Sequence, residues 1–115
     1  MCVMVVDDSP EMRRVVGRTL AGVATEIVEC GDGAEALTVY ARSRPDWVLM
    51  DVEMAGVDGI TATSQIVEAF PDARVVILTA HGAEPLRAAA REAGACAYVL
   101  KENLLELRRL LHSPS

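Results

Sequence analysis

Short apolar runs alternate with segments of mixed polarity along the whole chain. Each run is four or five residues long, which is the length of a strand. The first, third and fourth runs are almost continuously apolar, a pattern typical of strands that are covered on both faces of a sheet. The second run alternates polar and apolar residues and is expected at an edge. The five predicted strands are Cys2–Val6, Thr25–Glu29, Trp47–Met50, Arg74–Leu78 and Cys96–Leu100.

The segments between these runs have the spacing of amphipathic helices. Ser9 and Pro10 give the first helix an N-cap followed by a proline at its first position. The later helices are expected to open near Asp32-Gly33, Gly59, Pro85 and Asn103. Strict alternation of strands and helices predicts an α/β fold with a parallel sheet, right-handed crossovers and helices on both faces.

Composition limits the domain count and the class of function. The chain has 115 residues, which is enough for one domain, and we expect this domain to cover residues 1–112 with 113–115 as a tail or the start of a linker. A net charge of −6 disfavours direct binding to nucleic acid. No apolar run is long enough to span a membrane, so a cytoplasmic protein is expected. The three cysteines, Cys2, Cys30 and Cys96, are interpreted as small buried hydrophobic residues in a reducing compartment.

Polar residues follow four of the five predicted strands directly. In a doubly wound sheet, ligands bind outside the carboxyl ends of the strands, so these residues are expected to share one edge. Each has a structural alternative: an aspartate could cap a helix, the threonine could belong to a turn, and the lysine could be solvated. Because all of them are expected at one edge, a shared ligand-binding site is favoured over separate structural roles. The residues are Asp7, Asp8 and Ser9 after the first strand, Asp51 after the third, Thr79, Ala80 and His81 at the fourth, and Lys101 after the fifth.

Lys101 is the single lysine among eleven basic residues, the others being arginine. A compact ammonium and a planar guanidinium are not interchangeable at a site that needs one point charge. The position of this lysine at the same edge as the aspartates therefore indicates a chemical role.

Three clustered carboxylates repel one another unless a cation lies among them, and a few hard oxygen ligands suit Mg²⁺. One carboxylate can then attack a phosphoryl donor to give an aspartyl phosphate. Asp51 is the best nucleophile because it stands alone at the end of a central strand. Lys101, the Thr79 hydroxyl and the Ala80 backbone N–H would stabilise the oxygens of the transferred group.

Five sequence pieces resemble the receiver domain of bacterial two-component response regulators, the CheY-like family, over essentially the whole chain. They are V-V-D-D-S at 5–9, D-G-A-E-A-L at 32–37, D-V-E-M-A-G-V-D-G-I at 51–60, L-T-A-H-G at 78–82 and A-G-A-C-A-Y-V-L-K at 93–101. The resemblance implies a flavodoxin-like (βα)5 three-layer sandwich whose five-stranded parallel sheet has the order 2-1-3-4-5.

The resemblance also implies a role for each site residue. Asp51 would be the phosphoacceptor, phosphorylated by a sensor histidine kinase or a phosphotransfer protein. Mg²⁺ would be held by Asp8, Asp51 and the backbone carbonyl of Glu53, with Asp7 nearby and often acting through water. Thr79 and Lys101 would contact the phosphoryl group. Tyr98, three residues before the lysine, matches the aromatic residue that moves inward on activation, and its alternative is a half-buried strand residue.

Residues in two loops bear on the rate of dephosphorylation and on the geometry of the peptide after Lys101. Glu53 and His81 occupy the variable positions that set the rate of dephosphorylation in such proteins. Glu102 replaces a proline that commonly follows the lysine, and the family's cis peptide at this point would be costly without proline. The Lys101–Glu102 peptide is therefore open between cis and trans.

The family's readout face is the fourth helix, fifth strand and fifth helix. The last predicted helix carries more leucines than one buried face requires. Leu105 and Leu110 therefore either form a partner or homodimer surface or are simply exposed. The output would be a downstream protein or a fused output domain, with no direct contact of this domain to nucleic acid or membrane. The alternatives are a small Mg²⁺-dependent phosphatase acting through an aspartyl phosphate, a flavin-binding module, and a degenerate receiver that serves only as an interaction surface.

Overall fold

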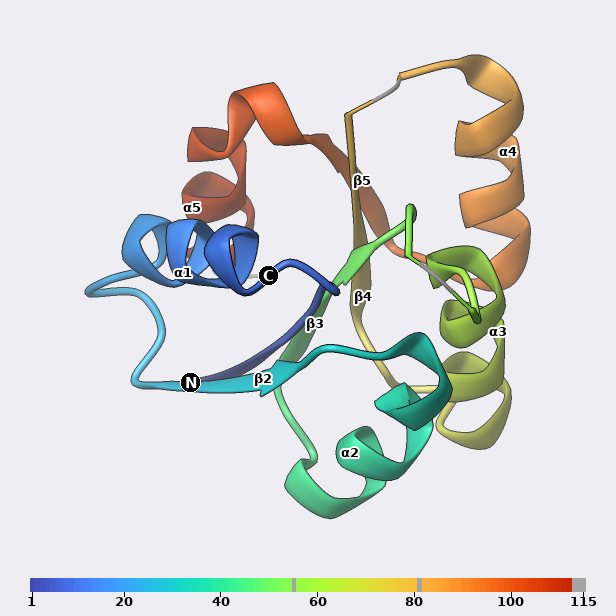
Figure 1. Ribbon diagram of the computed structural model, residues 1–115, viewed down its shortest axis with the longest axis horizontal. Helices are drawn as coiled ribbons and strands as arrows, with labels where there is room; N and C mark the ends of the chain where they lie inside the picture. Colours follow the sequence, from blue (N-terminus) through green and yellow to red (C-terminus); the bar gives the residue numbers. More distant parts are fainter. Residues whose placement is uncertain (55, 81, 113–115) are drawn as a thin grey trace.

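The computed structural model describes residues 1–54, 56–80 and 82–112, and it is a three-layer α/β sandwich (Figure 1). Five parallel strands form one sheet in the order β2-β1-β3-β4-β5. The predicted fold class and strand order are confirmed. The strands are β1 (Cys2–Val6), β2 (Glu26–Cys30), β3 (Trp47–Asp51), β4 (Val75–Thr79) and β5 (Ala97–Leu100). The helices are α1 (Pro10–Thr19), α2 (Ala36–Ser43), α3 (Gly59–Ala69), α4 (Glu84–Ala93) and α5 (Leu105–His112), with short 3₁₀ turns η1 (Gly33–Glu35) and η2 (Lys101–Asn103).

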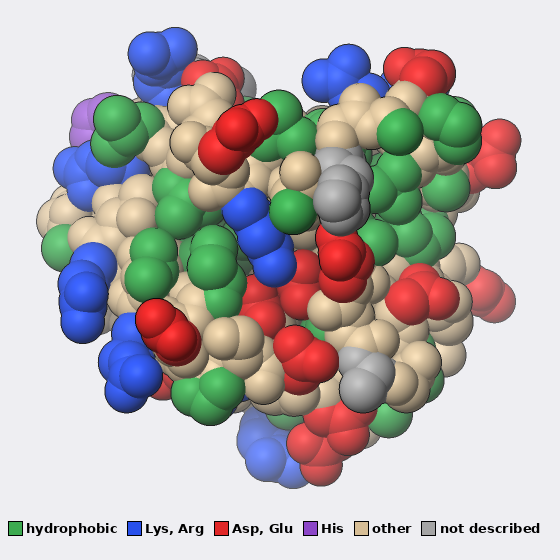
Figure 2. All heavy atoms as spheres, turned by 45° about the horizontal axis from the view of Figure 1, so that its top comes forward, with side chains coloured by type: hydrophobic (Ala, Val, Ile, Leu, Met, Phe, Trp, Pro, Cys, Tyr) green, Lys and Arg blue, Asp and Glu red, His purple; other side chains and the backbone are tan. Residues whose placement is uncertain are grey.

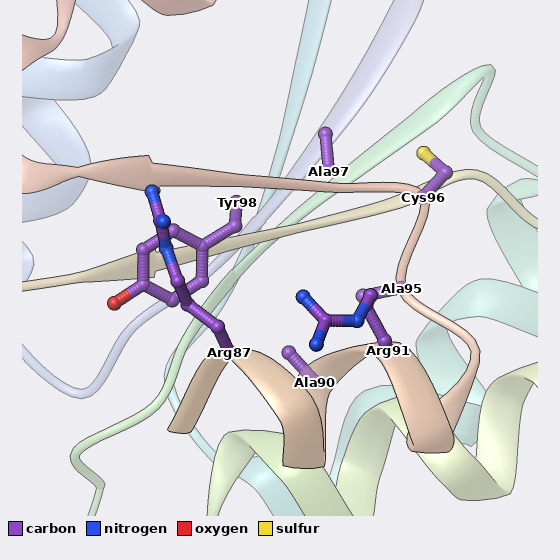
Figure 3. Close-up of a pocket in the computed structure, with 7 residues that line it drawn as sticks. All are labelled: Arg87, Ala90, Arg91, Ala95, Cys96, Ala97 and Tyr98. Atoms are coloured by element: carbon purple, nitrogen blue, oxygen red, sulfur yellow. The ribbon is translucent and has the colours of Figure 1, made fainter. Parts of the chain in front are cut away.

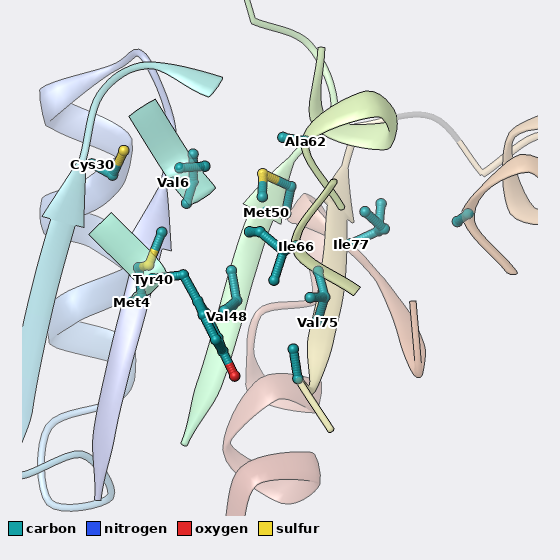
Figure 4. Close-up of a cluster of buried hydrophobic side chains, with 13 residues drawn as sticks. Met4, Val6, Cys30, Tyr40, Val48, Met50, Ala62, Ile66, Val75 and Ile77 are labelled. Atoms are coloured by element: carbon teal, nitrogen blue, oxygen red, sulfur yellow. The ribbon is translucent and has the colours of Figure 1, made fainter. Parts of the chain in front are cut away.

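The helices divide into two layers because every central strand is apolar on both faces. Helices α1 and α5 cover one face of the sheet, and α2, α3 and α4 cover the other (Figure 1). The α2–α3–α4 side is filled by one apolar cluster, shown in Figure 4, that includes Met4, Met50 and Ile66. The α1–α5 side is filled by a second cluster that includes Leu20, Leu49 and Leu107. These two cores fix the carboxyl ends of the strands at one edge.

The predicted strands agree with the structure to within about one residue at each end. The alternating second strand is at the edge of the sheet, as predicted. The differences in bounds follow from pairing, because β2 begins where Glu26 pairs with Cys2 and β4 extends to the pairing of Thr79 with Leu100. Strand ends are therefore set by register with a neighbour as well as by local sequence.

The helix starts follow local capping chemistry. Ser9 is the N-cap of α1, and its hydroxyl accepts a hydrogen bond from the Met12 N–H at 3.2 Å. Asp58 caps α3 by accepting from the Thr61 N–H at 2.8 Å. These caps orient the loops that leave the carboxyl ends of β1 and β3.

The interpretation of all three cysteines as buried residues is wrong for Cys96. Cys30 is buried and Cys2 is half-buried, whereas Cys96 is exposed. Cys96 precedes β5 instead of lying within it, so the sheet does not cover its side chain. The described cysteines are all free thiols. Within the described ranges, no helix is both long and apolar enough to cross a membrane.

Candidate functional site

Three aspartates meet at the carboxyl edge of the sheet. Asp7 and Asp8 follow β1, and Asp51 is the last residue of the neighbouring β3. One carboxylate oxygen from each lies within 4.8 Å of the others. Asp7 and Asp51 are only 2% and 1% exposed, whereas Asp8 is exposed. The sequence prediction of an acidic cluster from these residues is therefore confirmed in space.

Lys101 reaches this cluster from the end of β5, the outermost strand on the other side of β3 from β1. It begins η2 directly after β5, and its Nζ lies 2.8 Å from Asp51 Oδ1 and 3.6 Å from Asp7 Oδ2. The alternative of a solvated lysine is wrong, because its side chain is only 24% exposed and is paired. Figure 2 shows acidic side chains gathered on this face with a basic side chain among them.

The charges at this site shift one another's pKa values. Burial raises the pKa of Asp51, and the neighbouring Asp7 raises it further, while Lys101 opposes the change. Burial alone would lower the pKa of Lys101, but the two carboxylates outweigh burial and raise it. The ammonium is thus held in its charged form by carboxylates that are themselves crowded.

Backbone contacts fix the Asp51 carboxylate at the end of β3. Its Oδ1 accepts a 3.4 Å hydrogen bond from the Glu53 N–H, which curls the chain back at the strand end. Gly59 at the start of α3 packs against this same turn, and a Cβ there would lie closer than 3.0 Å to the Asp51 carbonyl oxygen. Glycine is therefore required for α3 to approach β3 so closely.

Asp7 is not the helix cap, since Ser9 fills that position. Its Oδ1 accepts a hydrogen bond from the Ser9 N–H at 2.9 Å. Its Oδ2 is buried without a hydrogen-bond partner among the described residues, and the 3.6 Å separation from Lys101 is too long for one. A buried carboxylate oxygen with this unmet capacity fits a cation that is shared with the other two aspartates.

The hydroxyl expected at the site comes from β4. Thr79 is fully buried at the end of this strand and pairs with Leu100, the residue before Lys101. Ala80 follows it and is exposed, and Glu53 is also exposed on the loop after β3. His81 lies outside the described residues. None of the described peptide bonds is cis, so the Lys101–Glu102 peptide is trans.

Tyr98 is on β5, which β4 separates from the β3 strand of Asp51, and it is half-buried. The guanidinium of Arg87, on α4, lies over its ring at 5.0 Å from the centroid. Tyr98 is thus placed between the carboxyl edge of the sheet and the α4 surface, and not within the acidic cluster itself.

Sequence reasoning missed two residues that shape the site. Gly59 is predicted as a helix start, but its close packing against the Asp51 carbonyl is not, although an Asp-Gly pair at a helix start is a local signal for a close approach. The contact of Arg13 with Asp7 could not be predicted, because an arginine on the polar face of a helix is normally expected to be solvated. Its Nη1 donates a hydrogen bond to the Asp7 carbonyl oxygen at 2.5 Å.

The donor set fits Mg²⁺. It consists of hard carboxylate oxygens on the open side of a fixed edge, and ligand oxygens about 2.1 Å from Mg²⁺ lie up to roughly 4.2 Å apart. The three carboxylate oxygens all lie within 4.8 Å of one another. The residues present could therefore hold the ion with small side-chain movements.

The fold and the site define a doubly wound α/β domain with an acidic cluster and one ammonium at the carboxyl ends of its strands. The family model for the response regulator receiver domain matches residues 3–112. The chain belongs to this family. The family is one of phosphorylation-activated signalling domains, and this match does not support the alternative of a small phosphatase.

Individual relatives agree with this assignment. The DNA-binding transcriptional regulator NtrC of Escherichia coli strain K12 is 37% identical over 99 residues, which cover 86% of this chain and 21% of NtrC. A LuxR-family two-component response regulator from Aurantimonas sp. SI85-9A1 is 33% identical with a TM-score of 0.85, covering 96% of this chain and 84% of that one. The Vibrio cholerae chemotaxis protein CheY4 is 25% identical with a TM-score of 0.88, covering 96% and 95%. The chain spans about a fifth of NtrC and about half of the response regulator GacA of Pseudomonas aeruginosa.

Proposed function

We propose that Asp51 accepts a phosphoryl group from a sensor histidine kinase or a phosphotransfer protein in a Mg²⁺-dependent reaction. The single observation that carries this proposal is the buried Asp51 carboxylate, paired with Lys101 at 2.8 Å and grouped with Asp7 and Asp8. A nucleophile, a cation site and an ammonium at one point are the components that phosphoryl transfer requires.

The ligands of the ion would be the carboxylates of Asp8 and Asp51 and the backbone carbonyl of Glu53, with Asp7 acting through water. When bound, Mg²⁺ supplies positive charge that offsets the negative charge of the transferring group. The unmet hydrogen-bonding capacity of the buried Asp7 Oδ2 supports a place for that residue in this arrangement.

In the reaction, a carboxylate oxygen of Asp51 forms a bond to phosphorus, and the bond from phosphorus to the donor's leaving atom breaks. Lys101 contributes an ammonium to the phosphoryl oxygens, and Thr79 and the Ala80 N–H contribute hydrogen-bond donors. Water later cleaves the acyl phosphate. The domain would thus catalyse only its own phosphorylation and dephosphorylation. Glu53, which is exposed, would tune the second step, as would His81, which lies outside the described residues.

The output would be read at the α4-β5-α5 face. The phosphoryl group adds about two negative charges and draws Thr79 toward it, which frees space behind the strand for Tyr98 to move inward. A cavity of about 230 Å³ adjoins this ring. Figure 3 shows Tyr98 on β5 facing Arg87 on α4 among the residues that line it. Leu105, which is 72% exposed on α5, adds an apolar element at which a downstream protein, a fused output domain or a second copy of the chain could pack.

We further propose that residues 1–112 form the receiver unit, with 113–115 outside the described residues as a tail or the start of a linker. The domain would act in the cytoplasm, with a kinase as its upstream partner. It would contact neither nucleic acid nor membrane directly.

The test is incubation with Mg²⁺ and acetyl phosphate, followed by intact-protein mass spectrometry. The wild type should gain one phosphoryl group, and Asp51→Asn should not. Asp72→Asn is a matched control, because Asp72 is exposed before β4, at the opposite edge of the sheet, and this variant should still be phosphorylated. An unmodified wild type that also fails to bind beryllofluoride, or a gain in mass that persists in Asp51→Asn, would refute the proposal.

A further inference from the structure

Arg13 lies behind the acidic site, on α1, and connects two elements around it. Its Nη1 donates to the Asp7 carbonyl oxygen at 2.5 Å, and its Nε donates to Glu29 Oε1 on β2 at 2.8 Å. The Arg13 side chain is 16% exposed, whereas that of Glu29 is 53% exposed. The guanidinium is therefore largely buried between α1 and the edge strand instead of extending into solvent.

Gly31 leaves the space that this arrangement needs. A Cβ at this position would lie 3.1 Å from Arg13 Nη1, so the guanidinium would have to shift by a few tenths of an ångström. The chain turns here from β2 toward η1, so the guanidinium packs against bare backbone. Gly31 and Glu29 together hold Arg13 in reach of Asp7.

The contacts of Arg13 fix the peptide that carries both aspartates. The Asp7 N–H donates to the Cys30 carbonyl oxygen at 3.0 Å, and the Asp7 carbonyl accepts from Arg13. That carbonyl belongs to the peptide linking Asp7 to Asp8, so its direction sets where the Asp8 side chain leaves the backbone. Groups that orient metal ligands from behind are a general source of metal affinity.

We propose that Arg13 is a positioning residue of the divalent-cation site, acting by orienting the Asp7–Asp8 peptide. This inference rests on the proposed Mg²⁺ site. A positioning role and a purely electrostatic role predict opposite changes in cation affinity when Arg13 is replaced. Removing a positive charge near a cation site should strengthen cation binding by Coulomb's law, whereas removing an orienting bond should weaken it.

The experiment measures the Mg²⁺ dissociation constant of the full chain by isothermal titration calorimetry, with thermal unfolding measured in parallel. Arg13→Gln should bind Mg²⁺ about tenfold more weakly than the wild type, the low end of the range for residues that orient ligands. Arg13→Lys retains the charge and one donor and should recover part of this loss. Arg109→Gln removes an arginine of an exposed ion pair on α5 and should bind as the wild type does.

Gly31→Ala is a second variant, which retains Arg13 in the sequence but shifts its side chain. It tests the same proposal if Arg13→Gln does not fold. It should lower Mg²⁺ affinity by less than Arg13→Gln does. Unchanged or tighter binding in both folded variants would overturn the positioning role while leaving the proposed function intact. A wild-type protein that binds no Mg²⁺ would overturn the proposed function and this role together.

Discussion

The ammonium of Lys101 lies 2.8 Å from Asp51 Oδ1, the oxygen that also accepts the Glu53 N–H at 3.4 Å. Both carboxylates beside this ammonium are nearly inaccessible, since the side chains of Asp51 and Asp7 are 2% and 3% exposed. One positive charge therefore offsets two buried negative charges. A divalent cation bound to the same carboxylates would meet repulsion from the ammonium.

Replacing Lys101 with methionine should tighten Mg²⁺ binding and lower stability in the absence of the ion. Charges about 4 Å apart near a protein surface interact by about 4 kcal/mol, and a tenfold change in affinity needs only about 1.4 kcal/mol. We therefore expect at least about tenfold tighter binding, measured by calorimetry. The metal-free variant should melt at a lower temperature because Asp51 and Asp7 lose their counter-charge.

Lys101→Arg is the matched control for this change because it retains the charge, and its Mg²⁺ affinity should remain closer to that of the wild type. Arg109→Met removes an exposed positive charge on α5 and should leave affinity unchanged. Weaker Mg²⁺ binding in Lys101→Met would contradict the view that the ammonium repels the cation.

The raised pKa of Asp51 predicts a specific pH dependence of folding. Burial, reinforced by Asp7, raises the folded-state pKa above the ordinary value of 3.8. In the window between those two pKa values the folded state binds more protons than the unfolded state, so this group's contribution to stability falls as pH rises. Lys101 adds no slope there, because its stabilisation is fully present below pH 10.5 and is lost only as pH rises through its raised folded-state pKa.

The measurement is the free energy of unfolding of wild type and Asp51→Asn without Mg²⁺, from about pH 4 to pH 7. The difference between the two proteins isolates Asp51 from the other carboxylates. The Asn variant should gain stability relative to the wild type as pH rises, and Mg²⁺ should reduce this gain by stabilising only the wild type strongly. A difference that is flat or of opposite slope would refute the raised pKa.

The strands and the edge that carries the site were predictable because their signals are local. A strand such as Trp47–Asp51 is covered on both faces and must be apolar throughout, so its end is marked by the first charged residue. In a parallel sheet the carboxyl ends of the strands lie at one edge, so the sequence also predicts that Asp7, Asp51, Thr79 and Lys101 lie close together there.

The contacts around the site could not be predicted, because they depend on how distant segments meet. Arg13 reaches Asp7 beside Gly31, the residue after β2, which leaves space for its guanidinium. Cys96 is exposed because pairing with β4 starts at Ala97, one residue later than the apolar run suggests. The first outcome depends on how α1 packs beside β2, and the second depends on where β5 begins to pair with β4. Sequence periodicity specifies neither.

Gly59 and Gly17 form a matched pair for the packing at the end of β3. An added Cβ at Gly59 would collide with the Asp51 carbonyl oxygen, whereas Gly17, inside α1, has open space around it. Gly59→Ala should therefore cost about 1–3 kcal/mol of stability and disturb the Asp51 turn. Gly17→Ala should stabilise the protein by about 0.5–1 kcal/mol, because alanine is the better residue within a helix. Urea unfolding of both variants checks the signs, and a neutral Gly59→Ala would show that α3 can shift away from β3 without cost.

Leu105 and Leu107 separate the partner surface of α5 from its core. Leu107 is fully buried in the α1–α5 cluster, and Leu107→Ala should cost about 2–5 kcal/mol. Leu105 is 72% exposed, so Leu105→Ala should change the free energy of unfolding by less than about 0.5 kcal/mol. If Leu105 belongs to a homodimer surface, Leu105→Ala should still weaken the self-association that beryllofluoride induces, as measured by sedimentation velocity. Self-association that is equally strong in wild type and Leu105→Ala would remove this leucine from the interface, and a large loss of stability in Leu105→Ala would place it in the core instead.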